Sequence, residues 1–389
     1  MTTTLMLLGA VLVLLAVHPF ATYPFSLAVL GWLRPRPIEP QSRRGSRPRV
    51  ALCVCAYNEA AIIRQKAENM LAVADATRMA EVELLIYVDA AQDGTADALR
   101  GYEGRIRVIV GETRRGKSHG MNRLVGATTA EFVAFSDANV MFAPDAIDRL
   151  IAPFEDPEIG CVCGHLIYVS GAGTATAATG GLYWRLEEWI KALETKTGSV
   201  MGADGSIFAI RRALHHPPPA DIIDDMYVSL TILCNGWRVV RVDDALAYEE
   251  TVSRPAEEFS RKQRIACQAF NVHRMLWPRL RRLRGLDRYK YVSHKLLRWM
   301  SGPLMAVGLA AMLLGMVVAD GQVYAILAQC LLLGAIVAGL RWPEALPGKI
   351  LDILNAFTAT ALGVSRSLRG ERFQTWNPPQ SARSSAVTR

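Results

Sequence analysis

Carboxylate, amide and ammonium side chains follow four short apolar segments in the first part of the chain. The segments are residues 50–56, 82–88, 106–110 and 131–135. The polar residues that come after them are Tyr57, Glu59, Asp89, Asp93, Lys117, Asp137 and Asn139. Acidic and amide oxygens can bind a divalent cation, and basic side chains can bind an anion. These residue types are therefore candidates for a ligand site, provided that the fold brings them together.

Alternating strands and helices are the arrangement that would do so. Between the four apolar segments, residues 59–74, 95–100 and 117–128 have helical character. The alternation predicts an α/β domain with parallel strands, in which ligands bind beyond the carboxyl ends of the strands. The first strand is not followed by Gly-x-Gly-x-x-Gly, and the chain has no Gly-x-x-x-x-Gly-Lys-Ser/Thr. A dinucleotide-binding fold and a P-loop are therefore excluded.

Some of these side chains also have simpler explanations. Asp93 precedes Gly94 and Thr95, which is a common sequence for a turn and a helix cap. Lys117 follows two arginines and could be one more solvated charge of a basic loop. Polar residues after all four strands are harder to attribute to chance than any one of them, so the joint pattern favours a ligand site.

The composition of the 389-residue chain indicates a globular part joined to membrane segments. Hydrophobic residues make up 51% of the chain, and the mean hydropathy is +0.17 although 21% of residues are charged. Residues 2–33, 299–319 and 322–340 contain no Asp, Glu, Lys or Arg, and a helix needs ~20 residues to cross a bilayer. We expect a transmembrane segment over 1–33 and a transmembrane hairpin over 299–340. A cleaved signal peptide is the alternative at the N-terminus, but residues 1–5 lack the usual basic side chain.

Basic residues beside these segments predict the orientation. The net charge is +8, and arginines are frequent in the linker 34–49 and in the stretch 271–298. Because basic flanks stay in the cytoplasm, we expect a multi-pass protein of the inner (plasma) membrane with a cytoplasmic catalytic domain. The stretch 271–298 is expected to form basic interfacial helices, and 341–389 an interfacial or third membrane helix and a tail. Without zinc-finger spacing or an aromatic platform, we expect lipid headgroups and no nucleic acid as the partner.

Seven motifs in the same order resemble family 2 glycosyltransferases, in the membrane-anchored group related to cellulose, chitin and hyaluronan synthases. The resemblance covers roughly residues 50–300. The motifs are Cys55–Glu59, Asp89 with Asp93–Thr95, Gly116–Lys117, Phe135–Asn139, Gly202–Arg212, Asp224–Asp225 and Arg261–Arg264. The resemblance implies a GT-A fold (Rossmann-like, nucleotide-diphospho-sugar transferase) over 50–270, a nucleotide-sugar donor, and Mn²⁺ or Mg²⁺. It also implies an inverting displacement.

The resemblance also assigns roles on the donor side. Asp137 is expected to bind the metal directly, whereas Asn139 offers a neutral amide where many relatives have Asp. Asp89 is expected to bind the base, and Asp93 to lie near the ribose or the metal. The complete expected donor set is Tyr57, Glu59, Asp89, Asp93, Lys117, Asp137 and Arg264. Arg264 is the candidate clamp on the diphosphate, because its fork of donors matches phosphate oxygens.

Asp225, with Asp224 beside it, matches the general base of the family. A sugar hydroxyl is a weak nucleophile, and a carboxylate within reach can take its proton during the attack. Two adjacent acids raise each other's pKa when they are close, which suits that role. The alternative is that both acids stabilise the positive end of a following helix. Asp204 and Gly205 match the segment on the acceptor side.

One departure from the family limits the predicted reaction. Processive synthases have Trp after the last arginine of the final motif, whereas Ile265 follows Arg264 here. We therefore expect non-processive transfer from a nucleotide sugar, with UDP as the carrier by analogy. The expected acceptor is a hydroxyl of a lipid-linked or oligosaccharide substrate in envelope or exopolysaccharide synthesis. The alternatives are a polyprenyl-phosphate glycosyltransferase, which needs no base, and a catalytically inactive nucleotide-binding membrane subunit.

Overall fold

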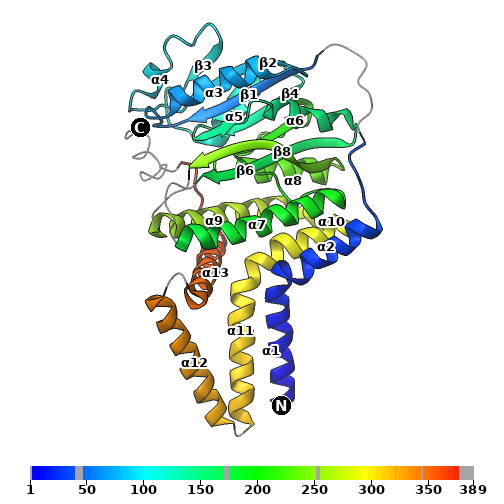
Figure 1. The fold of residues 1–389 in the computed structure, drawn as a ribbon, viewed down its shortest axis with the longest axis vertical. Helices are drawn as coiled ribbons and strands as arrows, with labels where there is room; N and C mark the ends of the chain where they lie inside the picture. The colour runs from blue at the N-terminus through cyan, green and yellow to red at the C-terminus, as the bar shows by residue number, and fades with distance from the viewer. Residues whose placement is uncertain are drawn as a thin grey trace.

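A mixed sheet, a layer of helices beneath it and a set of projecting helices make up the molecule (Figure 1). The computed structural model describes residues 2–39, 47–169, 175–250, 255–319, 321–342 and 345–375. Residues 40–46 of the expected basic linker and 376–389 of the expected tail lie outside these ranges. The N-terminus lies at the far end of the projecting helices (Figure 1).

The eight strands are ordered β3-β2-β1-β4-β7-β6-β8-β5 across the sheet. Its first half consists of parallel strands, as the sequence predicts: β1 (Arg49–Ala56), β2 (Glu81–Val88), β3 (Ile106–Val110) and β4 (Phe132–Asp137). β1 and β4 are mostly buried apolar runs because helices cover both of their faces, whereas β3 at the edge of the sheet is partly exposed. Their carboxyl ends lie at one edge, where the polar residues of the predicted site follow.

The second half of the sheet is not purely parallel, and here the expectation of parallel strands is incomplete. Its strands are β5 (Val140–Phe142), β6 (Ile159–Val169), β7 (Ile207–Arg211) and β8 (Arg238–Glu250). β7 runs antiparallel to both β4 and β6, and β5 runs antiparallel to β8, whereas β6 and β8 are parallel. The sheet is therefore mixed, and β7 adds the segment around residue 204 to the edge that carries the first four motifs.

Helices bury the two faces of the sheet in separate apolar cores. Val50, Leu52 and Val54 of β1 belong to the core that includes α3 (Ile63–Ala76), while Ala51 and Cys53 belong to the core that includes α5 (Lys117–Gly126). The alternation follows from the two-residue period of a strand. The short helices α4 (Thr95–Ala98) and α6 (Ala146–Ile151) complete the cover near the first core.

A layer of helices lies beneath the sheet and crosswise to the projecting helices (Figure 1). It contains α2 (Thr22–Leu33), α7 (Ala175–Lys196), α9 (Pro255–Leu280) and α10 (Gly285–Tyr291), and α8 (Asp224–Cys234) lies between this layer and the sheet. The apolar segment expected over 1–33 is thus divided, because α1 (Thr2–Val17) ends at a 3₁₀ turn that contains Pro19. Proline has no amide hydrogen to continue a helix.

Within the part of the chain that the structure describes, three helical segments are long and apolar enough to cross a membrane: Thr2–Phe20, Gly285–Val318 and Gln322–Arg341. The last two contain α11 (Leu297–Val318) and α12 (Gln322–Arg341), which agree with the predicted hairpin. α1 and α11 approach closely at two glycines, since a Cβ on Gly9 would lie 2.6 Å from the carbonyl oxygen of Gly308. Small residues allow such close backbone packing between helices in lipid.

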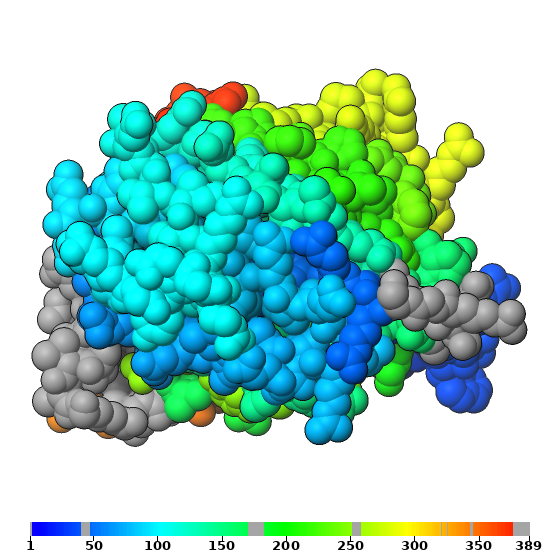
Figure 2. All heavy atoms as spheres, turned by 90° about the horizontal axis from the view of Figure 1, so that it is seen from above, coloured from blue at the N-terminus to red at the C-terminus, as the bar shows by residue number. Residues whose placement is uncertain are grey.

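The last helix, α13 (Leu346–Leu368), is longer than the apolar stretch 353–365 seen in the sequence. It is amphipathic, packs along α9 and is not among the candidate membrane spans of the described residues. The chain then crosses α9, where the Gln268 side-chain amide donates to the Phe373 carbonyl oxygen at 3.1 Å. Gln374 reaches the loop after β3 and donates to the Arg115 carbonyl oxygen at 3.3 Å, so the C-terminal segment lies beside that loop (Figure 2).

Candidate active site

Lys117 brings together two carboxylates that are far apart in the sequence. Its Nζ lies 2.7 Å from Oδ1 of Asp137 and 3.4 Å from Oδ2 of Asp224. Asp137 ends β4, Asp224 begins α8, and Lys117 begins α5. Burial alone would lower the pKa of Lys117, but the nearby carboxylates outweigh it and raise the pKa well above its usual value. Three predicted site residues therefore form one charged cluster at the carboxyl edge of the sheet.

Asp225 lies next to this cluster and against the predicted acceptor segment. A Cβ on Gly205 would lie 2.6 Å from Oδ2 of Asp225, so only glycine allows the backbone to approach this carboxylate. Burial, and then the charge of Asp224, raise the pKa of Asp225 to about 7. A carboxylate with such a pKa accepts protons readily near neutral pH, which is the property that a general base needs.

Asp204, also on the acceptor side, is held by charge. Its Oδ2 lies 3.4 Å from the Lys191 ammonium of α7, and its Oδ1 accepts a hydrogen bond from the Ser206 amide at 3.0 Å. Burial opposes ionisation, but Lys191 and the hydrogen bonds outweigh it and lower the pKa of Asp204. Asp204 therefore stays ionised to a lower pH than Asp225, and it joins the site to the layer of helices.

Asp89 organises the loop that leads to Lys117. This buried carboxylate accepts hydrogen bonds from the amides of Arg115 at 2.8 Å and Gly116 at 2.7 Å. The guanidinium of Arg114 in the same loop lies over the Tyr57 ring, 3.7 Å from its centroid. A flat surface and a carboxylate at the end of β2 suit a nucleotide base. The contacts of Asp89 also have a structural role, because they fix the loop without any ligand.

Asp93 and Glu59 lie at the same edge of the sheet, and both make hydrogen bonds that stabilise the loops there. Asp93 accepts hydrogen bonds from the Thr95 amide at 3.1 Å and from the Ala60 amide at 3.0 Å. The N-cap of α4 is Gly94 and has no side-chain cap, so these bonds stabilise the turn before the helix and are not the helix cap considered from the sequence. The Glu59 amide donates to the Thr95 hydroxyl at 2.8 Å. These bonds join the end of β1 to α4, and a donor role for Asp93 and Glu59 stays a prediction.

Asn139 has a partner that the sequence did not indicate. Its Nδ2 donates to Oε1 of Glu249 at 2.9 Å, which fixes the amide so that its oxygen points away from Glu249. Burial raises the pKa of Glu249 to about 7, with Asp137 adding to the effect and Arg261 opposing it. Glu249 lies near the end of β8, so the rule used for the first four strands would have found it if β8 had been recognised.

Two further cations surround the cluster. Lys66 of α3 is fully buried, and its Nζ donates to the Ser136 hydroxyl at 2.7 Å and to the Val140 carbonyl oxygen at 2.5 Å. These bonds hold both ends of the turn that carries Asp137 and Asn139, and sequence reasoning missed them because a helix lysine is usually exposed. Arg264 of α9 donates to Gln268 at 3.0 Å, and burial, with help from Arg261, lowers its pKa to about 10.

The donor atoms at this edge fit a divalent cation only in part. The described residues contain no group of three or more His, Cys, Asp or Glu side chains arranged to hold a metal ion. Asp137 and Asn139 nevertheless offer oxygens, and the Lys117 ammonium already lies between Asp137 and Asp224 as a cation would. Mg²⁺ and Mn²⁺ are commonly bound by one or two carboxylates together with substrate phosphates. The residues therefore fit a cation that arrives with its nucleotide.

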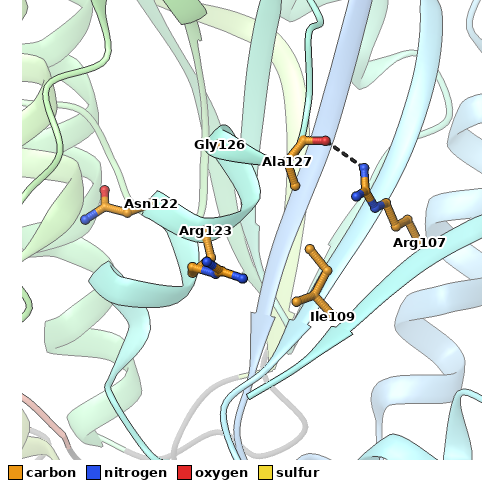
Figure 3. Close-up of a pocket in the computed structure, with 6 residues that line it drawn as sticks. All are labelled: Arg107, Ile109, Asn122, Arg123, Gly126 and Ala127. Atoms are coloured by element: carbon orange, nitrogen blue, oxygen red, sulfur yellow. Dashed lines mark hydrogen bonds between the residues drawn. The ribbon is translucent and has the colours of Figure 1, made fainter. Parts of the chain in front are cut away.

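A separate hollow lies on the outer side of the domain. It measures about 420 Å³ and is lined by Arg107, Ile109, Asn122, Arg123, Gly126 and Ala127. Arg107 and Ile109 come from the edge strand β3, and the others from α5 and the residue after it (Figure 3). Arg107 donates to the Ala127 carbonyl oxygen at 2.7 Å. None of the predicted site residues lines this hollow, so it is distinct from the charged cluster.

The fold and the cluster together define a nucleotide-diphospho-sugar transferase of the GT-A type. The chain belongs to the glycosyltransferases of family 2, since the model of "Glycosyltransferase like family 2" matches residues 48–268, more than half of its length. The expected resemblance is thereby confirmed. The family match includes Asp89, Asp137 and Asp225, but it does not by itself assign their roles.

Curated relatives and a solved structure agree with this assignment. An N-acetylglucosaminyltransferase of Rhizobium sp. strain N33 is 25% identical over 226 residues, 53% of this chain and 50% of the relative. One of Bradyrhizobium diazoefficiens is 23% identical over 292 residues, 71% of this chain and 59% of the relative. The chain thus spans about half the length of the curated relatives it matches. The mannosyltransferase PcManGT of Pyrobaculum calidifontis, solved with GDP-mannose and Mn²⁺, has a TM-score of 0.71 at 20% identity. The match covers 94% of this chain and 99% of that one.

Proposed function

We propose that this glycosyltransferase moves a sugar from a UDP-sugar to a hydroxyl of a lipid-linked or oligosaccharide acceptor, by inverting and non-processive transfer. The observation that carries the proposal is the position of Asp225, a half-buried carboxylate with a pKa of about 7 against Gly205 and beside the Lys117–Asp137 pair. The curated relatives named N-acetylglucosaminyltransferase support N-acetylglucosamine as the first donor sugar to test. A pathway in envelope or exopolysaccharide synthesis would supply such acceptors.

In this mechanism one set of residues binds the donor, and Asp225 acts on the acceptor. Asp89 and Tyr57 would bind the base, and Lys117 and Arg264 the phosphates. Asp137 and Asn139 would hold Mn²⁺ or Mg²⁺, which supplies neutralisation of charge on the leaving diphosphate. Asp225 would take the proton of the acceptor hydroxyl as the hydroxyl attacks the anomeric carbon. Asp224, bound to Lys117, would keep the Asp225 pKa high by its nearby charge.

The proposed location is the inner membrane, with several spans and the catalytic domain in the cytoplasm. Three apolar helices of sufficient length support membrane association. The basic residues between 274 and 298 support the orientation, because they precede α11 directly and basic flanks stay in the cytoplasm. Nucleotide sugars are made in the cytoplasm, so this orientation gives the cluster access to its donor.

A donor panel tests the proposal. The full chain in detergent would be given UDP-N-acetylglucosamine, UDP-glucose or GDP-mannose with Mn²⁺ or Mg²⁺, and release of the nucleotide diphosphate would be measured. GDP-mannose is included because PcManGT was solved with it. We expect release from a UDP-sugar, and loss of release in Asp225→Asn but not in Asp75→Asn, an exposed carboxylate at the end of α3.

The same donor panel distinguishes the proposed function from the two alternatives, a polyprenyl-phosphate glycosyltransferase and an inactive nucleotide-binding subunit. A polyprenyl phosphate is already anionic and needs no base, so full activity of Asp225→Asn would favour that acceptor. Nucleotide binding without release from any donor would indicate an inactive binding subunit. The buried charge of Asp225 argues against both, because neither function needs a carboxylate whose burial opposes ionisation.

A further inference from the structure

The junction between the catalytic domain and the membrane helices contains a buried network of charges. Glu194 of α7 accepts hydrogen bonds from the Tyr23 hydroxyl and lies 2.7 Å from Nδ1 of His294. Nε2 of the same histidine lies 3.1 Å from Oε1 of Glu187. Arg298, in the first turn of α11, donates from Nη1 to the other oxygen of Glu187. Each carboxylate of this network therefore has its own partner.

Arg298 keeps one side of its guanidinium group without a partner. Nη1 contacts Glu187 and the Tyr183 hydroxyl, whereas Nε and Nη2 are buried and make no hydrogen bond with any described residue. A buried polar group without a hydrogen bond costs about 1–3 kcal/mol, so such groups usually await a ligand or a water. Nε and Nη2 form the edge that binds two oxygens of a phosphate or carboxylate side by side.

Lys295 places a second cation one turn before Arg298. Among the residues that the structure describes, its ammonium group has no hydrogen-bond or ion-pair partner within the distances that the other pairs show. Its Nζ lies 3.8 Å from the position that a Cβ of Gly202 would take. Gly202 begins the segment that continues to Asp204 and Gly205. Lys295 therefore contacts the acceptor side of the site from below, on the side of the membrane helices.

The backbone at Lys295 is unusual as well. Residues Val292–Leu296 form a π-helical turn between α10 and α11. Such turns interrupt α-helices mostly at functional sites, because the extra residue redirects the side chains that follow. The exposed Tyr183 of α7 lies beside Arg298, and tyrosine is frequent where a helix meets a membrane surface. The two cations thus lie where the chain enters the apolar helix α11.

We propose that Lys295 and the Nε–Nη2 edge of Arg298 bind the phosphoryl group that links the acceptor saccharide to its lipid. The proposal rests on the glycosyltransferase function above and specifies its acceptor: a saccharide on a polyprenyl phosphate or diphosphate, not a free oligosaccharide. The phosphoryl group is bound here and is not attacked, since the sugar hydroxyl near Asp225 remains the nucleophile. Held at this point, the lipid chain would extend along α11 while the saccharide reached Gly205.

The charges around Lys295 and Arg298 favour a phosphoryl group over a ligand without phosphate. Glu187 is paired with Arg298, and Glu194 with His294, while Glu188 and Asp204 are paired with Lys191. Among the residues that the structure describes, Lys295 makes no ion pair with any of these four carboxylates. A phosphoryl group would pair with Lys295 and also fill the open edge of Arg298. A neutral sugar or a lipid alcohol would do neither.

Binding measurements test the site without an identified saccharide. The full chain in neutral detergent would be titrated with a long-chain polyprenyl diphosphate, the matching polyprenol, phosphatidylglycerol and inorganic diphosphate, and affinity followed by thermal stabilisation. We expect polyprenyl diphosphate to bind at least ten-fold more tightly than the other three. Lys295→Gln and Arg298→Lys should each weaken it about ten-fold, since a charged hydrogen bond contributes ~1.5–3 kcal/mol. Arg298→Lys keeps a charge for Glu187 and so preserves the fold.

A control variant and three control ligands show whether binding at Lys295 and Arg298 is specific. Lys196→Gln, at an exposed lysine that ends α7, should bind every probe as the parent chain does. Equal binding of polyprenol and polyprenyl diphosphate would overturn the proposal, and equal binding of phosphatidylglycerol would show a general headgroup site instead. The affinity for UDP should be unchanged in Lys295→Gln. Loss of UDP binding or turnover in the parent chain would refute the proposed function separately, because it leaves the lipid titration unaffected.

Discussion

The pH dependence of transfer should report the ionisation of Asp225. The structure raises the pKa of this carboxyl to about 7 by burial and by the charge of Asp224. A base must be ionised, so activity should be present above pH 7 and fall as the pH decreases through that value. With a pKa near 7, about one tenth of the groups are ionised at pH 6, which predicts a rate about ten-fold below the plateau.

Two substitutions separate Asp225 from other groups that titrate in this range. Asp225→Asn should lower turnover by ~10²–10⁴-fold, the usual contribution of a general base. Asp224→Asn removes the neighbouring charge, so the acid limb of kcat/KM should move to lower pH. The assay is nucleotide diphosphate release between pH 5 and 9, with UDP affinity measured at each pH as the control. An acid limb that stays in place in Asp224→Asn would refute the assignment.

The same pKa predicts an independent effect on stability. Because the folded-state pKa of Asp225 lies above its ordinary value of 3.8, the native protein binds more protons than the unfolded chain between pH 3.8 and about 7. Stability should therefore decrease as the pH rises through this window, and the cost should be complete above pH 7. Asp225→Asn removes that cost, so its melting temperature at pH 8 should exceed that of the parent chain. A lower melting temperature there would contradict the buried charge.

Three further substitutions test other parts of the site. Lys66→Met removes the donor to the Ser136 hydroxyl and to the Val140 carbonyl oxygen, which should lower the free energy of unfolding by about 1–3 kcal/mol in urea. It should also raise the Mn²⁺ concentration needed for half-maximal nucleotide binding. Gly205→Ala should decrease kcat and leave the donor KM unchanged, because its Cβ would displace Asp225. Asp137→Ala should abolish the Mn²⁺ dependence of UDP affinity, measured by calorimetry; a dependence equal to that of the parent chain would refute the metal assignment.

The parallel half of the sheet was predictable because each of its strands is a local apolar run. β1, β2 and β3 begin within one residue of the predicted positions, and polar residues follow each one. The antiparallel half was not recognised for a physical reason. β8 carries charged residues at its centre, Asp243 and Asp244, so it shows no simple apolar period. β7 lies within the motif 202–212, which was interpreted only as the segment on the acceptor side. Their pairing depends on strands that are distant in the sequence.

In the site too, the residues that belong to local motifs were predictable, whereas contacts between distant parts of the chain were not. Residue types and motif order placed Lys117, Asp137 and Asp224 at one edge, and the structure brings these three into contact. The sequence could not show that Lys66 supports the Asp137 turn, nor that Glu249 orients Asn139, because both contacts join elements far apart in the chain. A buried lysine on a helix and a carboxylate at the end of a charged strand look like ordinary surface residues until their neighbours are known.

One segment joins the two proposed parts of the acceptor site. In the segment 202–205, a Cβ on Gly202 would lie 3.8 Å from the Lys295 Nζ and a Cβ on Gly205 would lie 2.6 Å from the Asp225 Oδ2, and Asp204 between them is bound by Lys191 of α7. A displacement of α11 relative to the catalytic domain would therefore move Gly205 against the base. Because Gly205 has no side chain to absorb such a shift, acceptor binding at the membrane and proton transfer at Asp225 should be coupled through this backbone. Lys295→Gln should accordingly reduce kcat for a lipid-linked acceptor as well as raise its KM.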